Sequence, residues 1–198
     1  MKVSTTTNAK ESALLERAKQ GDERAFTELV RQYEDLVYNF SFKVCRDRGA
    51  ATETLQDTFV NVYRKLGQFD GKSKFSTWLY TIVANNCLMK RRRAKLEKAS
   101  VSIDEPTMPG HDHDDAALRE ASLVAPWNVT PLDETMTREL RSHLDAAIQK
   151  LPVDYRLVFI LRDLEGQSAE ETAKIMKLSV PAVKSRLRRA RVFLRDEL

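Results

Sequence analysis

The chain has 198 residues, 42% of them hydrophobic, which is enough for one ordinary domain or two small ones with a real core. The first residues contain no apolar signal segment, and no apolar run approaches the ~20 residues of a membrane-spanning helix. We therefore expect a globular cytoplasmic protein with no membrane insertion. The formal net charge of +4 is small, but the basic residues gather in two blocks, at residues 90–98 and 184–195.

Helical periodicity begins after Gly21-Asp22, where Asp22 is the predicted N-cap, and continues to Val44 in steps of three and four. Gly49 is predicted to separate this helix from the next. The apolar stripe of that second helix, which should face the core, consists of Leu55, Phe59, Val62 and Leu66. Its polar face carries Glu53, Asp57, Asn61 and Arg64.

A third helix is predicted after the loop FDGKSK, in the segment FSTWLYTIVANNCLMKRRR. From composition alone it is a core helix whose basic end suits the negative end of the helix dipole. Trp78 is expected to lie mostly in the core, because Phe75 and Ile82 flank it at helical spacing. The basic block that ends the helix should bind phosphates, which predicts nucleic-acid binding that weakens steeply with salt.

Residues 98–134 lose the periodicity, contain four prolines and are strongly acidic, so they are interpreted as a linker. Within them, LREASLVAPW could form a short docked helix. The string HDHDD has metal-capable side chains but no rigid framework, and no metal site is expected there. Cys45 and Cys87 have no ligand spacing either and are expected to be reduced thiols in the core or at its edge.

Helical signal returns over residues 135–198, so the predicted class is all-α. Ser168 and Glu171 match a capping box, and Ser179 matches the N-cap of a second helix that tolerates Pro181 in its first turn. The inward stripe of that helix consists of Val183, Leu187, Ala190 and Leu194. Its outward residues are Lys184, Ser185, Arg188 and Arg189. This is the pattern of a helix-turn-helix whose second helix enters the DNA major groove.

The alternative is a helical hairpin with a solvated basic face. Agreement of the cap, the turn and the one-sided charge favours DNA binding over that alternative. A search for catalytic motifs finds no nucleophile with its base, no Walker loop and no dinucleotide fingerprint. We therefore expect that the protein is not an enzyme and needs no cofactor.

The order of these parts closely resembles the extracytoplasmic-function (ECF) group of bacterial sigma factors, in the sigma-70 family. The strings that carry the resemblance are AFTELVRQYEDLVYNF, LQDTFVNVYRKL, FDGKSKFSTWLYTIVAN and LPVDYRLVFILRDLEGQSAEETAKIMKLSVPAVKSRLRRAR. It implies sigma region 2 at residues 1–97, sigma region 4 at 135–198, and a linker at 98–134 in place of region 3. It also implies a transcription initiation factor that directs core RNA polymerase to −35 and −10 promoter elements and stabilises the opened −10 strand.

The resemblance further implies partners and residues. The partners are core RNA polymerase (clamp helices of the largest subunit, flap of the second largest), promoter DNA and an anti-sigma factor. The residues implied for polymerase binding are Gln56, Asp57, Asn61 and Arg64. Those for the −10 element are Phe69, Asp70, Gly71, Lys72, Ser73, Lys74, Phe75 and Asn85, and the basic block adds Lys90, Arg91, Arg92 and Arg93. Those for the −35 element are Ser179, Pro181, Ala182, Lys184, Ser185, Arg186, Arg188 and Arg189.

Several points stay open at this level. Many relatives carry arginine at the position of Lys184. Lysine offers a single point charge, whereas arginine can make two parallel hydrogen bonds to one base. Asn86 adjoins the expected asparagine, Asn85. The acidic linker has two hypothetical roles, screening the basic blocks in the free protein or following the positively charged path of the polymerase. The competing functions are a helix-turn-helix regulator that acts without core polymerase and a helical adaptor that binds only protein.

Overall fold

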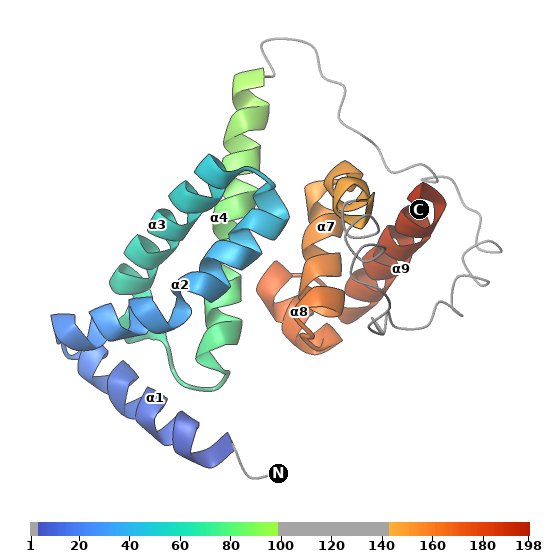
Figure 1. Cartoon of the computed structure of the whole chain (residues 1–198). Coiled ribbons are helices and arrows are strands. Elements are labelled where there is room, and N and C mark those ends of the chain that lie inside the picture. Colours follow the sequence, from blue (N-terminus) through green and yellow to red (C-terminus); the bar gives the residue numbers. More distant parts are fainter. Residues whose placement is uncertain (1–3, 99–142) are drawn as a thin grey trace, which may run out of the picture. The chain divides into compact units, whose positions relative to one another are not determined.

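The computed structural model of the chain describes residues 4–98 and 143–198, and within these ranges all regular structure is helical (Figure 1). The predicted all-α class is therefore confirmed. Residues 99–134 of the predicted linker, with the short helix proposed in them and the HDHDD string, lie outside the described residues. The chain divides into two compact units between Cys87 and Leu88, inside a long helix.

The first unit contains α1 (Ser4–Lys19), α2 (Glu23–Cys45), α3 (Arg48–Lys65), the short 3₁₀ turn η1 (Leu66–Gln68) and the first part of α4 (Phe75–Lys98). Asp22 caps α2 as predicted, because its carboxylate accepts hydrogen bonds from the backbone amides of Arg24 and Ala25 at 3.0 and 3.1 Å. Helix α1 was not predicted, since its apolar content is slight. It nevertheless buries Leu14 and Leu15.

The predicted break at Gly49 is wrong. Helix α2 ends at Cys45, and Arg46 then takes a left-handed conformation with φ 57°. Asp47 starts the next helix by accepting a hydrogen bond from the amide of Ala50 at 2.7 Å. Gly49 consequently lies inside the first turn of α3, where the cap compensates for its weak helix propensity.

The predicted core stripe of α3 is only partly right. Val62 and Leu66 are buried, but Leu55 and Phe59 are half-buried. Ala51 and two threonines, Thr54 and Thr58, fill other core positions of the helix. The threonine hydroxyls are satisfied in place: Thr54 donates to the carbonyl of Ala50 at 2.7 Å, and Thr58 takes part in a bond with Asn86 at 3.0 Å. A hydrogen-bonded hydroxyl is inexpensive to bury, so an apolar pattern alone misplaces this face.

The second unit includes helical residues 143–150, α7 (Val153–Phe159), the π-helical turn η3 (Ile160–Leu164), α8 (Ala169–Met176) and α9 (Val180–Glu197). All four residues of the predicted inward stripe of α9 are buried, and α9 packs on α7 and α8. The turn between α8 and α9 passes through Lys177, which has φ 53°. Ser179 caps α9 through the amide of Ala182 at 3.3 Å, so the predicted helix-turn-helix is confirmed.

Ser168 and Glu171 form the predicted capping box at the start of α8, with the Glu171 amide donating to the Ser168 hydroxyl at 3.0 Å and the Ser168 amide donating to the Glu171 carboxylate at 2.8 Å. We predict that Ser168→Ala destabilises α8 by about 1 kcal/mol, because one amide loses its acceptor. Glu171→Gln keeps an acceptor and should cost less. Hydrogen exchange of the α8 amides measures both effects, and unchanged protection in Ser168→Ala would contradict the prediction.

Candidate nucleic-acid and polymerase interface

The loop that precedes α4 is anchored at both ends by aromatic rings. Phe69 and Phe75 are 6% and 3% exposed, and their ring centroids lie 5.4 Å apart. The ring centroid of Trp78 lies 5.4 Å from that of Phe69 and 5.6 Å from that of Phe75. Tyr33 of α2 packs edge-on against Phe75, with ring centroids 5.1 Å apart. Trp78 packs in this cluster but is half-buried, so it lies at the edge of the core and is less buried than predicted.

The residues between these anchors are exposed. Gly71 has φ 73°, a conformation that glycine adopts without strain. Asp70 pairs with the Lys72 ammonium at 2.9 Å and accepts from the Lys72 amide at 3.1 Å. These two hydrogen bonds lower the pKa of Asp70, so the turn carries a closed ion pair at neutral pH. The loop presents backbone, short polar side chains and Lys74 to solvent.

Asn85 and Asn86 have different surroundings on α4. Asn85 is half-buried, whereas Asn86 is buried and fully engaged with α3. The Asn86 amide donates to the Thr58 hydroxyl at 3.0 Å and its carbonyl accepts from Asn61 at 3.1 Å. The structure therefore connects Asn61, predicted for polymerase binding, to the residue next to Asn85, predicted for the −10 element.

The predicted polymerase-binding residues share the outer face of α3. Gln56, Asp57 and Arg64 are exposed, and Asn61 is half-buried. Two large apolar residues lie among them that sequence reasoning missed: Val60 is 49% exposed and Tyr63 is 58% exposed. An apolar centre with a charged rim is the usual anatomy of a protein interface. The signal in the sequence was their position on the polar side: Val60 lies three or four residues from Asp57 and Gln56, and Tyr63 lies three residues after Val60.

The four residues of the basic block at the end of α4 differ in solvent exposure. Arg92 and Arg93 are exposed, while Lys90 and Arg91 are half-buried. The block therefore presents its outer two guanidinium groups most fully.

The predicted −35 residues lie along the start of α9. Ser179, Pro181, Lys184 and Ser185 are exposed, and Ala182, Arg186, Arg188 and Arg189 are half-buried. The Arg186 guanidinium lies 6.0 Å from the centre of the Tyr155 ring, within reach of a cation–π contact. These positions flank the buried stripe on both sides, and the exposed ones lie in the first turns of α9.

Arg191, farther along α9, has a different role. It donates two hydrogen bonds to Asp163 of η3, at 2.8 and 2.6 Å, and both side chains are mostly buried. These hydrogen bonds raise the pKa of Arg191. A two-pronged ion pair of this kind fixes the helix α9 against η3.

The two cysteines, a possible metal site and a possible membrane helix were also considered in the sequence. Cys45 and Cys87 are free thiols, half-buried and buried, as expected. Among the residues that the structure describes, no cluster of histidine, cysteine, aspartate or glutamate is placed to hold a metal ion. Nor does any helix in the described ranges have the length and apolar character needed to cross a membrane.

Comparison with known proteins places this geometry in a family. Residues 29–97 match the model of Sigma-70 region 2, and residues 142–194 match that of Sigma-70 region 4. The RNA polymerase sigma-H factor of Pseudomonas aeruginosa is 34% identical, covering 93% of this chain and 92% of that protein. The ECF RNA polymerase sigma factor SigW of Bacillus subtilis is 30% identical, covering 93% and 94%.

A solved structure shows the same fold: the sigma factor RpoE in complex with the anti-sigma factor NepR from Bartonella quintana, with a TM-score of 0.61 and 22% identity over 87% of this chain and 95% of that one. The predicted family is thus confirmed, since two separate regions match in order and curated relatives match over nearly the whole chain. The chain belongs to the sigma-70 family of RNA polymerase sigma factors, in its extracytoplasmic-function group.

Proposed function

We propose that this sigma factor joins core RNA polymerase through the outer face of α3, opens the −10 element at the loop before α4, and reads the −35 element with α9. The observation that carries this proposal is the buried Asn86 contact, which joins the α3 face and the Asn85 helix within one compact unit. In this scheme residues 1–97 form the region 2 domain, 98–134 the linker and 135–198 the region 4 domain. The protein acts in the cytoplasm and performs no chemistry of its own.

Docking on the polymerase is supported by the composition of the α3 face. Val60 and Tyr63 supply apolar area that a partner can cover, and Asp57 and Arg64 supply charges at its edge. Aromatic residues at the centre of a contact carry much of the binding energy, whereas edge charges set orientation and association rate. The clamp helices of the largest subunit are the proposed partner surface, and the flap of the second largest subunit is proposed for region 4.

Strand opening requires a place for the unstacked base. Unstacking costs a few kcal/mol, which contacts with the extruded base must offset. The loop at residues 69–75 is held by its aromatic anchors, and Gly71 lets backbone approach a base closely. Asn85 offers both a donor and an acceptor to a base edge. Arg92 and Arg93 then neutralise phosphates of the opened strand.

Recognition of the −35 element is assigned to the exposed start of α9. In this proposal Lys184 and Ser185 reach base edges, and Arg188 and Arg189 reach phosphates. A helix-turn-helix regulator that works without polymerase is not favoured, because region 2 has no part in such a protein. The relative solved with NepR supports one more proposal: an anti-sigma factor binds this chain and holds it inactive.

The first test separates polymerase binding from strand opening. Asp57→Arg reverses a charge on the α3 face and should weaken binding to core polymerase by about tenfold or more. Asp35→Arg makes the same charge change on exposed α2 and should bind normally. Asn85→Ala should retain polymerase affinity but reduce promoter opening about tenfold, because a base loses its partner. Fluorescence titration measures affinity and permanganate reactivity measures opening.

Two outcomes of this experiment would contradict the proposal. One is equal loss of polymerase affinity in Asp57→Arg and Asp35→Arg, which would indicate a general effect of charge. The other is the same pattern of defects in Asp57→Arg and Asn85→Ala, which would remove the division of labour between the two helices.

The second test concerns the arginines of α9. Arg189→Ala should lower the slope of log affinity against log salt for promoter duplex by about 1, since one phosphate contact is lost. Arg191→Ala should leave that slope unchanged and instead destabilise the region 4 unit by about 1–3 kcal/mol, because Asp163 loses its charged partner. Holoenzyme binding measured across a salt series, with hydrogen exchange of α7 to α9, distinguishes them. A reduced slope in Arg191→Ala would refute this assignment.

A further inference from the structure

Helix α1 lies outside the matched region 2, which begins at residue 29, yet it contacts one end of the loop before α4 directly and the other end through Tyr33 of α2. At one end, the Lys19 ammonium lies 5.6 Å from the centre of the Phe69 ring. At the other, the Glu11 carboxylate accepts a hydrogen bond from the hydroxyl of Tyr33, whose ring packs on Phe75. The helix is therefore built into the same structure that holds the loop.

A cavity of about 310 Å³ opens between α1 and the loop. On one side it is lined by Glu11, Ser12 and Leu15 of α1, and on the other by Gly71, Ser73 and Lys74 of the loop. The buried Tyr33, the aromatic anchors Phe69 and Phe75, and Ser76 of α4 complete its lining. Apolar side chains at the base of a hollow, with a few polar groups on its walls, are the usual composition of a ligand site.

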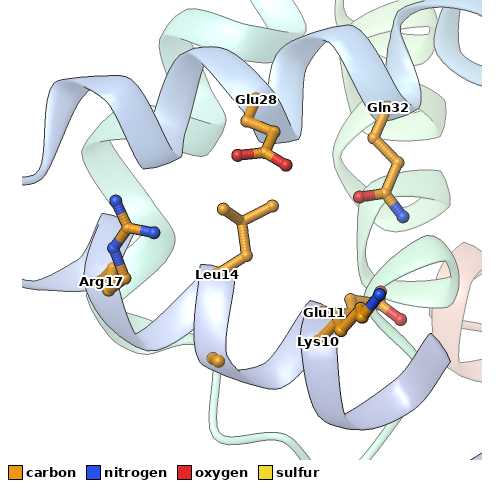
Figure 2. Close-up of a pocket in the computed structure, with 7 residues that line it drawn as sticks. Lys10, Glu11, Leu14, Arg17, Glu28 and Gln32 are labelled. Atoms are coloured by element: carbon orange, nitrogen blue, oxygen red, sulfur yellow. The ribbon is translucent and has the colours of Figure 1, made fainter. Parts of the chain in front are cut away.

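A second hollow borders the other side of α1, and its lining is different (Figure 2). It lies between α1 and α2, where Glu28 points toward Leu14, and no loop residue lines it. Glu11 borders both hollows, but Glu28 borders only the second of these two. The two carboxylates thus form a matched pair, one beside the loop and one away from it.

We propose that α1 completes the pocket for the unstacked −10 base, and that Glu11 is a specificity-determining residue that selects a base with an exocyclic amino group. This inference rests on the proposed function of the loop. A carboxylate only accepts hydrogen bonds, so it pairs with the exocyclic amino group of cytosine, adenine or guanine, a group that thymine lacks. The Watson–Crick edge that carries these groups becomes accessible only after the base leaves the duplex.

The surroundings of Glu11 suit this role. Burial, together with the hydrogen bond to Glu11, raises the pKa of Tyr33, so its hydroxyl remains a donor and orients the carboxylate at working pH. That bond uses one of the about four acceptor positions of a carboxylate, which leaves capacity for a base. Lys74 on the opposite wall supplies the positive charge that a phosphodiester requires, so the acidic wall faces the base.

The test uses holoenzyme assembled from core polymerase and the full chain. Single-stranded oligonucleotides randomised over the −10 element are bound, recovered and sequenced. The wild-type factor should prefer bases with an exocyclic amino group (cytosine, adenine or guanine) over thymine at one position, and Glu11→Gln should reduce that preference about tenfold, because glutamine also donates. Glu28→Gln makes the same charge change and should leave the preference unchanged.

The outcomes separate this inference from the function on which it rests. Wild-type holoenzyme that selects no base at any position would overturn the proposed function of the loop. Normal selection by the wild type, with identical selection by Glu11→Gln, would overturn the role of Glu11 alone. Equal weakening for every oligonucleotide in Glu11→Gln would assign Glu11 a structural role and also overturn the inference. Glu11→Asp, which keeps the charge on a shorter side chain, should show an intermediate preference and covers a folding failure of the first variant.

Discussion

The packing of Phe75 against Tyr33, Phe69 and Trp78 determines where the loop before α4 can lie. Phe75 is the first residue of α4, so the same contact that buries its ring also fixes where that helix starts. Aromatic pairs of this kind add about 0.5–1.5 kcal/mol each beyond the burial of their area. The exposed loop residues are thus held between two buried ends. A loop held in place before DNA arrives loses less conformational entropy when it binds a base.

The buried bonds of Asn86 make a second constraint, which acts across the helices. Its side-chain NH₂ donates to Thr58 and its side-chain oxygen accepts from Asn61, and both partners belong to α3. Breaking either bond would leave a buried polar group without a partner, at a cost of about 1–3 kcal/mol. Helices α3 and α4 therefore keep one register, and a partner that covers the α3 face meets Asn85 in a defined position. This gives a physical basis for the proposed coupling between polymerase docking on α3 and −10 recognition by Asn85.

Local signals explain which parts of the fold the sequence predicted. The caps at Asp22, Ser168 and Ser179 each depend on residues within three positions, and all three predictions are confirmed. The predictions that failed involve either two competing local signals or contacts between residues far apart in the sequence. The Asp47 cap overrode the break expected at Gly49, and the buried hydroxyl of Thr58 is satisfied by Asn86, 28 residues away. The comparisons confirm the family, whereas the roles of individual site residues remain predictions.

The basic residues show why the sequence could locate the candidate DNA-binding surface but could not tell which of its residues are available to DNA. The basic residues of α9 look equivalent in the sequence, yet the structure uses them differently. Arg191 is tied to Asp163, and Arg186 lies near Tyr155, while Lys184 is exposed. A cation already paired inside the protein releases no counterion when DNA binds, so a count of lysine and arginine overestimates the electrostatic contribution. The specificity of α9 therefore depends on which cations the fold leaves exposed, and this follows from η3 and α7 as much as from the recognition helix itself.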